Sequence, residues 1–283
     1  MLFRSYLLLL QQILLEFDFF YGVGQFAQDY GLLIPKMGIE TGFFGQEMVN
    51  LDLIYDKRRN NTKNNSAVPI SYHLGASNHD CSQTVPQASL ALLTGSNSGG
   101  KTMCLRTCAH AIILAQMGFP SLGTLDFTPY DEIYYFKKSN GQISAGAFET
   151  TLKQFVQLAQ SNSSKIIFAD ELESITEPNA ASKVLAGIFS LFLANPLNTG
   201  IFVTHIVDLI VREFTQEQRG QIRIDGIEAE GLDKDLNLII NRNPKFNFVA
   251  KSTPELILTR LAKSGSPQQQ EFFKSILSKF ENR

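Results

Sequence analysis

Short apolar segments alternate with longer helical segments through the middle of this chain. Four runs have the short, almost wholly apolar character of buried strands, and helical segments separate them; the runs are 90–94, 132–136, 166–169 and 201–204, and the helical segments are 101–117, 148–159 and 180–193. Buried strands separated by helices of this length are typical of a layered α/β sheet that is parallel in its centre. The pattern therefore predicts an α/β core flanked by helices.

The two ends of the chain follow a helical pattern. Residues 1–30 are predicted to form a helix, and the glycines and proline of residues 31–45 predict a connector. Two further helices are expected at 254–263 and 267–280, because each segment has a proline in its first turn. We therefore expect three units: an N-terminal helix and connector over 1–45, a central domain over 46–263, and a C-terminal helix over 264–283.

Two other segments of the central domain have weaker patterns. Residues 48–55 partly alternate apolar and polar positions, which predicts a strand. The Asn-rich and basic residues 56–66 are expected to form a loop, either solvated or in contact with a phosphate backbone. Residues 221–228 and 236–241 are expected to form a late hairpin or an edge pair.

The first segment is strongly apolar from Met1 to Tyr21, and no small-residue cleavage site follows it. Polar residues interrupt the run at Gln11, Gln12, Glu16 and Asp18. The interrupted run cannot comfortably span a bilayer. We expect an amphipathic helix whose Leu and Phe face packs on a partner surface, and no association with a membrane.

Composition changes this picture little. Of the 283 residues, 44% are hydrophobic and 18% are charged, and the net charge is −2. These values are those of an ordinary globular protein and exclude a globally basic surface for nucleic acid. The cysteines, Cys81, Cys104 and Cys108, form no C-x-x-C pair, so a disulfide framework and a zinc site are not expected. We expect a reducing, cytoplasmic location.

One octapeptide between a predicted strand and a predicted helix carries most of the candidate chemistry. It fits the pattern G-x-x-x-x-G-K-[ST] and consists of Gly95, Ser96, Asn97, Ser98, Gly99, Gly100, Lys101 and Thr102. The glycines permit a tight loop whose backbone N–H groups point inward, and the following helix adds the positive end of its dipole. Such a loop binds the phosphates of ATP. Lys101 is expected to hold the β and γ phosphates, and Thr102 to bind Mg²⁺.

Two more predicted strands end in polar residues. Asp170 and Glu171 follow the apolar run 166–169, and adjacent acids there are costly unless a cation faces them. We expect Asp170 to coordinate Mg²⁺ and Glu171 to polarise the attacking water. His205 ends the next strand, where it can hydrogen-bond the γ phosphate or the water, although a structural role is also open to a single histidine. The sequence predicts a magnesium-dependent ATPase of the P-loop class.

With these parts in order, residues 45–262 resemble the MutS family of DNA mismatch repair proteins, whose ATPase domain belongs to the ABC class of P-loop proteins. The resemblance rests on four segments: Asn97–Thr102, the turn Ala115–Pro120, Asp170–Leu172 with Thr176–Pro178, and Thr204–His205. It implies that ATP-driven motions act on mismatched or double-stranded DNA. It also implies that the first helix is the tail of a lever region, and that mismatch-reading regions lie on other segments.

The resemblance further implies a homodimer in which two ATPase domains pair head to tail. In the family, a serine before a phenylalanine reaches the γ phosphate of the partner. When the segment 144–149 is aligned on Phe148, that serine position falls on Gly146, and Ser144 or the N–H groups of the helix start are the candidate replacements. We expect the dimer seam at this helix.

Three other functions are compatible with a phosphate-binding loop. One is a nucleotide-dependent assembly module with little turnover. Another is the ATPase subunit of a transporter, which is disfavoured because no Leu-Ser-Gly-Gly-Gln segment precedes the acidic pair. A small-molecule kinase is disfavoured because residues 137–164 contain no arginine for a lid.

Overall fold

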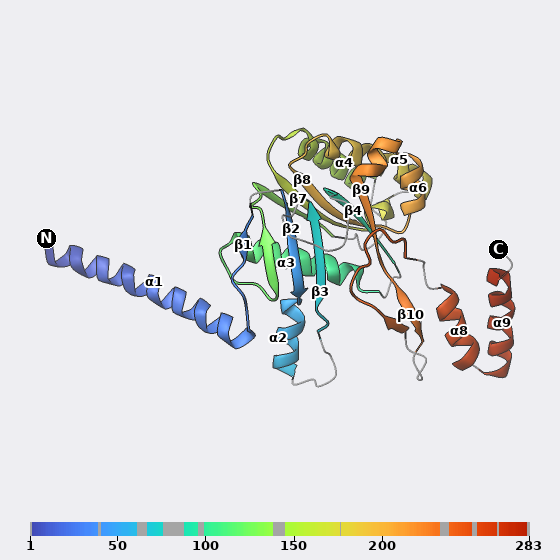
Figure 1. Ribbon diagram of the computed structural model, residues 1–283, viewed down its shortest axis with the longest axis horizontal. Helices are drawn as coiled ribbons and strands as arrows, with labels where there is room; N and C mark the ends of the chain where they lie inside the picture. Colours follow the sequence, from blue (N-terminus) through green and yellow to red (C-terminus); the bar gives the residue numbers. More distant parts are fainter. Residues whose placement is uncertain are drawn as a thin grey trace.

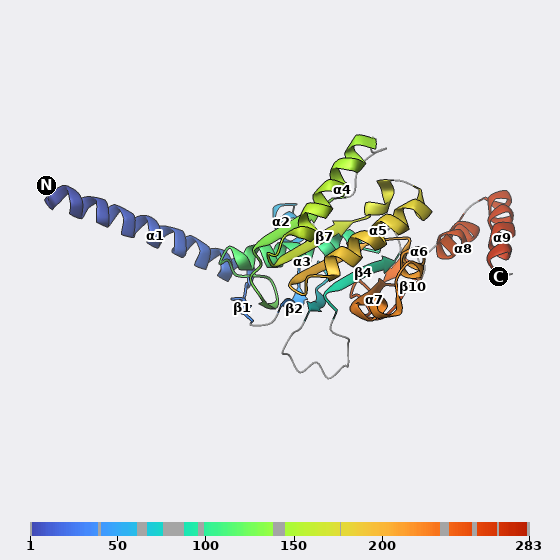
Figure 2. The ribbon, with the colours of Figure 1, turned by 90° about the horizontal axis from the view of Figure 1, so that it is seen from above.

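The structure is a computed structural model that describes residues 2–38, 41–60, 67–75, 88–95, 99–137, 145–175, 177–232, 238–250, 254–264 and 266–281. Two sheets form the body of the molecule, and helices project from it on two sides (Figures 1 and 2). The helix α1 (Leu2–Tyr30) extends from one side, and the helices α8 (Pro254–Ser264) and α9 (Pro267–Glu281) lie at the other.

The larger sheet is parallel throughout. It consists, in spatial order, of β6 (Glu132–Phe136), β7 (Lys165–Asp170), β8 (Asn198–Val203), β4 (Leu90–Gly95) and β9 (Ile222–Ile227). Each neighbouring pair hydrogen-bonds in the parallel sense. The predicted α/β class with a parallel central sheet is therefore confirmed, and so are the four strands that the apolar runs predict.

Alternate side chains of the central strands enter two separate cores. On one face, Leu93 and Phe168 pack with the helix α3 (Lys101–Gln116), which lies between the two sheets. On the other face, Leu92 and Ile167 pack beneath the covering helices. These helices are α4 (Ala145–Gln160), α5 (Pro178–Leu193) and α6 (Val207–Arg212). Burial on both faces explains why these strands are apolar runs rather than alternating ones.

The second sheet lies on the other side of α3. Its strands are, in order, β1 (Lys36–Met37), β5 (Thr124–Phe127), β2 (Gly42–Met48) and β3 (Ile70–Gly75), with β2 antiparallel to both of its neighbours. Because α3 is covered on both sides, its cysteines Cys104 and Cys108 are buried in the core. Small buried side chains there let the helix approach both sheets.

Two expectations for the central domain are wrong. Residues 48–55 were predicted to form a strand, but the strand β2 ends at Met48 and the helix α2 (Leu51–Asn60) follows. The same helix includes residues 56–60 of the expected loop 56–66. Residues 61–66 lie outside the described part. The helix forms because Asn50 accepts a hydrogen bond from the backbone N–H of Asp52, which starts a helical turn.

The late strands are also arranged differently from the expectation. β9 lies in the parallel sheet beside β4, and residues 236 and 237 of the expected partner segment lie outside the described part. The antiparallel pair is instead formed by β10 (Ala229–Leu232) and β11 (Leu238–Ile240). A short helix, α7 (Gln216–Gln221), leads into β9 and begins with a capping box between Thr215 and Gln218.

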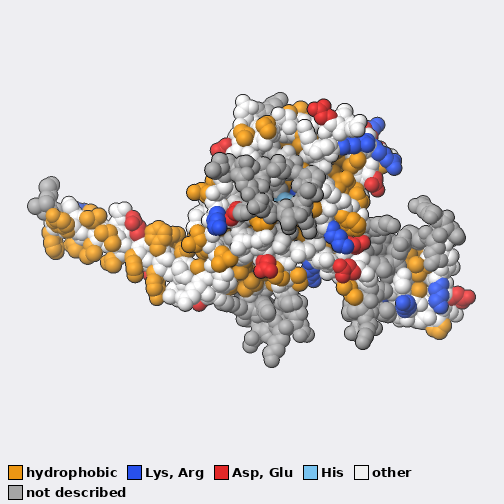
Figure 3. All heavy atoms as spheres, in the orientation of Figure 1, with side chains coloured by type: hydrophobic (Ala, Val, Ile, Leu, Met, Phe, Trp, Pro, Cys, Tyr) orange, Lys and Arg blue, Asp and Glu red, His pale blue; other side chains and the backbone are white. Residues whose placement is uncertain are grey.

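The helix α1 exposes large apolar side chains along much of its length. They include Phe3, Leu8, Leu15 and Phe20, each more than half exposed. Figure 3 shows hydrophobic side chains, in orange, along the projecting helix. By length and composition alone, residues 3–30 are long and apolar enough to cross a membrane. The expectation that the interrupting polar residues rule out such a span is therefore wrong. The same test is passed by signal sequences near an N-terminus.

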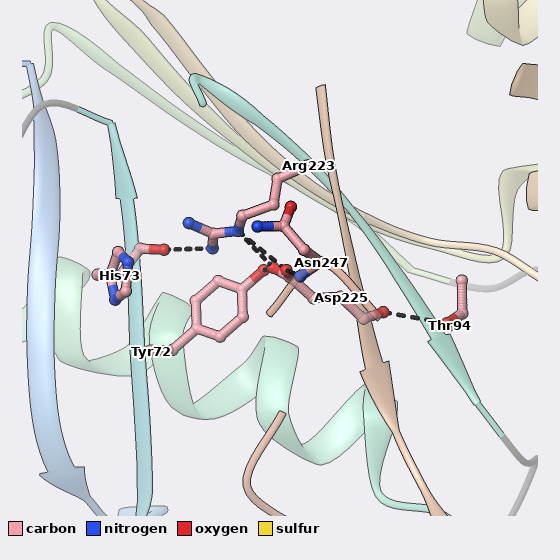
Figure 4. A network of polar contacts seen from close by, with 6 residues as sticks. All are labelled: Tyr72, His73, Thr94, Arg223, Asp225 and Asn247. Carbon is pink, nitrogen blue, oxygen red and sulfur yellow. Dashed lines mark hydrogen bonds and ion pairs between the residues drawn. The ribbon is translucent and has the colours of Figure 1, made fainter. Parts of the chain in front are cut away.

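A buried charged network joins the two sheets beside β4, the strand that leads into the phosphate loop (Figure 4). The guanidinium of Arg223 on β9 donates from Nε to both carboxylate oxygens of Asp225, at 2.9 and 3.0 Å. Tyr72 on β3 donates its hydroxyl to Asp225 Oδ2 at 2.6 Å. Arg223 also lies over the ring of Phe246, with its Cζ atom 4.5 Å from the ring centroid.

The network reaches the strand that leads into the phosphate loop. The hydroxyl of Thr94 donates to the backbone oxygen of Asp225 at 3.0 Å and accepts from the N–H of Ala250 at the same distance. Arg223 and Asp225 are almost completely buried, with 1% and 0% of their surfaces exposed. Buried charges are tolerated only when they are paired and hydrogen-bonded. The pair therefore ties β3, β4 and β9 together.

We predict that Asp225→Asn lowers the free energy of unfolding by about 3–5 kcal/mol, because it leaves the buried guanidinium of Arg223 without its counter-charge. Chemical denaturation of both proteins measures the loss. The control is Asp208→Asn on the exposed surface of α6, for which a change within about 0.5 kcal/mol is expected. Equal stability of the two variants would contradict the structural role of the pair.

Candidate functional site

The polar residues predicted for the site lie at one edge of the parallel sheet. Leu93 of β4 and Asp170 of β7 are both register partners of Val203 on β8, so β7 and β8 end at the same level, and β4 runs two residues farther, to Gly95. The residues that follow these positions therefore meet at the carboxyl edge of the sheet, where ligands bind in open α/β folds. This arrangement brings together the P-loop, the acidic pair and His205.

Gly95 begins the phosphate loop in a conformation that requires glycine. Its φ is +136°, which side-chain-bearing residues rarely adopt. A Cβ atom there would also lie 2.4 Å from the backbone oxygen of Ile227 on β9. The close approach of β9 therefore fixes where the loop leaves the sheet.

The loop re-enters regular structure at the start of α3. Gly100 is the N-cap of this helix in the left-handed region, with φ 90° and ψ 14°. Lys101 is only 3% exposed, and its Nζ atom donates to the backbone oxygen of Gly95 at 2.8 Å, across the mouth of the loop. Gly99 is buried, whereas Ser96, Asn97 and Ser98 lie outside the described residues. The described ends of the loop fit a phosphate cradle.

Thr102 and Asp170 lie together as a magnesium site requires. The Thr102 hydroxyl donates to Asp170 Oδ2 at 2.8 Å, and the Asp170 residue is 2% exposed. A hydroxyl and a carboxylate are hard oxygen ligands of the kind that Mg²⁺ prefers, and Mg²⁺ takes its remaining ligands from phosphates and water. In the described part of the chain, no group of three His, Cys, Asp or Glu side chains could hold a metal alone. The pair therefore fits a cation that arrives with a nucleotide.

Glu171 and His205 form the second pair. His205 Nε2 and Glu171 Oε1 are 2.9 Å apart, and the two side chains are 32% and 13% exposed. Glu171 adopts φ 48°, a left-handed conformation uncommon for a residue with a side chain. Its N–H nevertheless donates to the backbone oxygen of Val203, which continues the β7–β8 pairing beyond Asp170. Strained backbone at a strand end is frequent at functional sites.

Glu173 is a third acid at this edge, and the sequence motifs did not identify it. It lies in the short 3₁₀ helix η1 (Leu172–Ile175), and its Oε1 atom accepts the backbone N–H of His205 at 2.6 Å. Burial raises the pKa of Glu173, while the hydrogen bond from His205 opposes the shift. The only signal in the sequence is a further acid two residues after Glu171.

The stretch expected to contact a partner nucleotide is described only from residue 145. Gly146 lies in the first turn of α4, and the helix therefore begins earlier than the predicted start at residue 148. Ser144 lies outside the described residues. The helix at which we expect the dimer seam therefore begins at Ala145 in the described part of the chain.

These elements define the class of the protein. A strand, a phosphate loop and a helix are followed by an acidic strand end, and β8 lies between the loop strand β4 and the acidic strand β7. Residues 91–225 match the family described as "ATPase family associated with various cellular activities (AAA)". This match and our expectation of the ABC class agree at the level of the P-loop ATPase. The domain is an ATPase of the P-loop class.

Within that class the domain is MutS-like, as the sequence motifs predicted. The chain is 43% identical over 216 residues to the "DNA-binding protein MutS2" of Pyrococcus furiosus, an alignment that covers 75% of this chain and 37% of the relative. It is 24% identical over 280 residues to the "Endonuclease MutS2" of Finegoldia magna, covering 96% of this chain and 33% of that protein. In a shorter alignment of 123 residues, the chain is 32% identical to the "DNA mismatch repair protein MSH6" of Arabidopsis thaliana. This alignment covers 42% of this chain and 9% of that protein.

The chain spans about a third of the length of the two MutS2 relatives, 37% of one and 33% of the other. The alignment to the Finegoldia protein covers nearly the whole chain, including regions beyond the P-loop ATPase match at 91–225. The comparisons therefore establish the ATPase domain of this chain and do not extend to the activities of the whole, longer relatives.

We predict that Gly95→Ala lowers the free energy of unfolding by about 1–3 kcal/mol or more, because of its positive φ and the contact with Ile227. Thermal unfolding compares it with Gly187→Ala, a glycine of α5 where an added Cβ meets nothing within 4 Å. The control should be more stable than the unsubstituted protein by about 0.5–1 kcal/mol. A Gly95 variant as stable as the control would show that β9 does not constrain the loop.

Proposed function

We propose that this chain is a magnesium-dependent ATPase module that works as a switch: two copies close on two ATP molecules, and hydrolysis reopens them. The observation that carries this proposal is the meeting of two polar pairs at the ends of β4, β7 and β8: Thr102 with Asp170, and Glu171 with His205. The proposal extends ATP binding and hydrolysis, which the P-loop ATPase domain supports, to the roles of single residues.

ATP binding is assigned to the octapeptide from Gly95 to Thr102. The backbone N–H groups of the loop and the start of α3 contact the phosphates, and Lys101 exchanges its bond to the Gly95 oxygen for the β and γ phosphates. Thr102 and Asp170 hold Mg²⁺. When bound, this cation neutralises the charge that develops on the phosphate oxygens.

Hydrolysis is assigned to the second pair. Glu171 accepts a hydrogen bond from the attacking water and orients its oxygen toward the γ phosphorus. His205 is held 2.9 Å from the same carboxylate, so its ring can donate to the γ phosphate or to the water. The water oxygen forms a bond to the γ phosphorus while Glu171 takes up the proton that the water loses. The bond from this phosphorus to the β–γ bridging oxygen breaks, and the leaving oxygen remains on ADP.

Dimerisation is assigned to the face that carries α4. The first turn of this helix includes Gly146 in place of the family serine, so its backbone N–H groups would make the contact to the partner's γ phosphate. Exposed residues farther along the helix include Val156, which is 40% exposed. Figure 2 shows the end of α4 standing clear of the sheet, where a second domain has access.

Double-stranded DNA, mismatched or branched, is the proposed object of the switch. The support is the resemblance to two relatives whose names include the word DNA. The net charge of the full sequence is −2, so its composition does not predict a general basic surface. The opening and closing of the ATPase pair would be passed to DNA-binding segments through the helices at its ends. Salt-dependent binding to branched and mismatched duplexes, with and without ATP, tests this part.

We predict that Lys101→Ala abolishes tight ATP binding, because the β and γ phosphates lose their only loop cation. Isothermal titration calorimetry with ATP and Mg²⁺ measures the effect. The control is Lys183→Ala on the exposed face of α5, which should bind ATP as the unsubstituted protein does. Unchanged affinity in the Lys101 variant would place the nucleotide elsewhere.

We predict that Glu171→Gln keeps ATP binding but lowers kcat by about 10²–10⁴-fold, because the amide cannot activate the water. It should also prolong the closed dimer. Phosphate release and size-exclusion chromatography with ATP measure both effects, and Glu217→Gln on the exposed surface of α7 is the control. Hydrolysis at the unaltered rate would refute the assignment of Glu171. Negligible hydrolysis by the unsubstituted protein, with nucleotide-dependent dimers, would favour an assembly module instead.

A further inference from the structure

Glu173 connects two turns that are far apart in the sequence. The first is η1, which follows the acidic strand β7 directly, and the second is the turn at Thr204 and His205, which follows β8. The strands themselves are hydrogen-bonded neighbours up to Asp170 and Val203. One further backbone bond, from the Glu171 N–H to the Val203 oxygen, continues this pairing. Farther on, the side chains of Glu171 and Glu173 contact His205.

The carboxylate of Glu173 makes this connection through the backbone of His205. Its Oε1 atom accepts the His205 N–H at 2.6 Å. A carboxylate bond to a backbone N–H is charge-assisted and stronger than a bond between neutral groups. The Thr204 hydroxyl in turn accepts the N–H of Ile206 at 3.2 Å, so the turn is fixed at successive residues.

The second oxygen of the carboxylate is kept at a cost. Glu173 Oε2 is buried and finds no hydrogen-bond partner among the described residues. A buried polar atom without a partner costs roughly 1–3 kcal/mol and calls for an explanation. The fold alone gives none, because η1 is a short turn at the edge of the sheet. The charge-assisted bond that Oε1 makes to the His205 N–H offsets part of this cost.

One short segment thus holds a single histidine at two points. Glu171 contacts the His205 ring at Nε2, and Glu173 holds the His205 backbone. If the backbone were released, the ring would lose the fixed position from which it reaches Glu171, because a side chain can be no better placed than its Cα atom. Preorganised groups of this kind lower the cost of reaching the transition state.

We propose that Glu173 is a positioning residue, whose carboxylate fixes the Thr204–His205 turn so that the His205 imidazole stays in contact with Glu171. The inference rests on the proposed function, in which Glu171 and His205 act on the attacking water. Glu173 makes η1 and the turn after β8 move as one unit.

The test compares two substitutions that differ in their ability to accept a hydrogen bond. Glu173→Gln keeps an oxygen for the His205 N–H and should leave kcat within about threefold of the unsubstituted protein. Glu173→Met has a similar length but no such acceptor, and loss of the hydrogen bond to the His205 N–H should lower kcat by about 10- to 100-fold, with the affinity for ATP unchanged. Glu177→Met, at an exposed position that caps no N–H group of α5, is the control and should be neutral.

A double-variant comparison identifies the residue through which Glu173 acts. Combined with His205→Gln, the Met substitution should lower kcat no further than His205→Gln does alone, because both remove the same arrangement. Additive losses would overturn the proposal. So would equal activity of the Gln and Met variants.

Nuclear magnetic resonance of the histidine rings separates this inference from the proposed function. The chain has four histidines, and the His205 signal is assigned by its absence in His205→Gln. The chemical shifts of the His205 ring nitrogens should change in Glu173→Met and remain unchanged in Glu173→Gln, whether or not the protein hydrolyses ATP. An unchanged His205 signal in the Met variant would overturn the positioning role. If Glu173→Met does not fold, Glu173→Asp, which withdraws the carboxylate by one methylene, must give the same displacement.

Discussion

The parallel hydrogen bonding of β8 between β4 and β7 is the constraint on which the site depends. It sets Leu93, Val203 and Asp170 at one level across three strands. The phosphate loop, the acidic pair and His205 each follow one of these strands, and they meet because the three neighbouring strands run in the same direction and end at the same edge of the sheet. A different strand order would leave each motif intact in sequence and separate them in space.

The helix α3 and the buried ion pair hold this arrangement in place. α3 is packed between the two sheets, so the end of the phosphate loop is anchored in the main core. Behind the loop, Arg223 and Asp225 on β9 are hydrogen-bonded to each other, and Asp225 is also bonded to Tyr72 on the second sheet. Asp225 further accepts a bond from Thr94, the residue before Gly95. The loop therefore begins and ends on rigid structure, as a site that must bind triphosphate in one geometry requires.

The hydrogen-bonded pairs at the sheet edge also indicate how nucleotide state can be transmitted. Thr102 with Asp170 connects α3 to β7, and Glu171 and Glu173 both contact His205 after β8. A change at the γ phosphate would displace groups on α3, at the end of β7 and after β8, because each of these segments contributes a group within hydrogen-bond distance of the next. In the longer MutS2 relatives, about two thirds of the protein lies outside the part matched here.

The sequence alone determined the phosphate loop, the acidic strand end, the strand before His205 and the α/β class. These features are local: a loop of fixed spacing and strands buried on both faces leave their pattern in consecutive residues. The tertiary structure decided what depends on distant partners. Leu51–Asn60 became a helix although short apolar patterns fit both structures, and β9 paired with β4 rather than in a hairpin. The bond from Glu173 to His205 spans 32 residues, and the pairing of Tyr72 with Asp225 spans 153. Such contacts arise only when packing brings the segments together, so no spacing in the sequence records them.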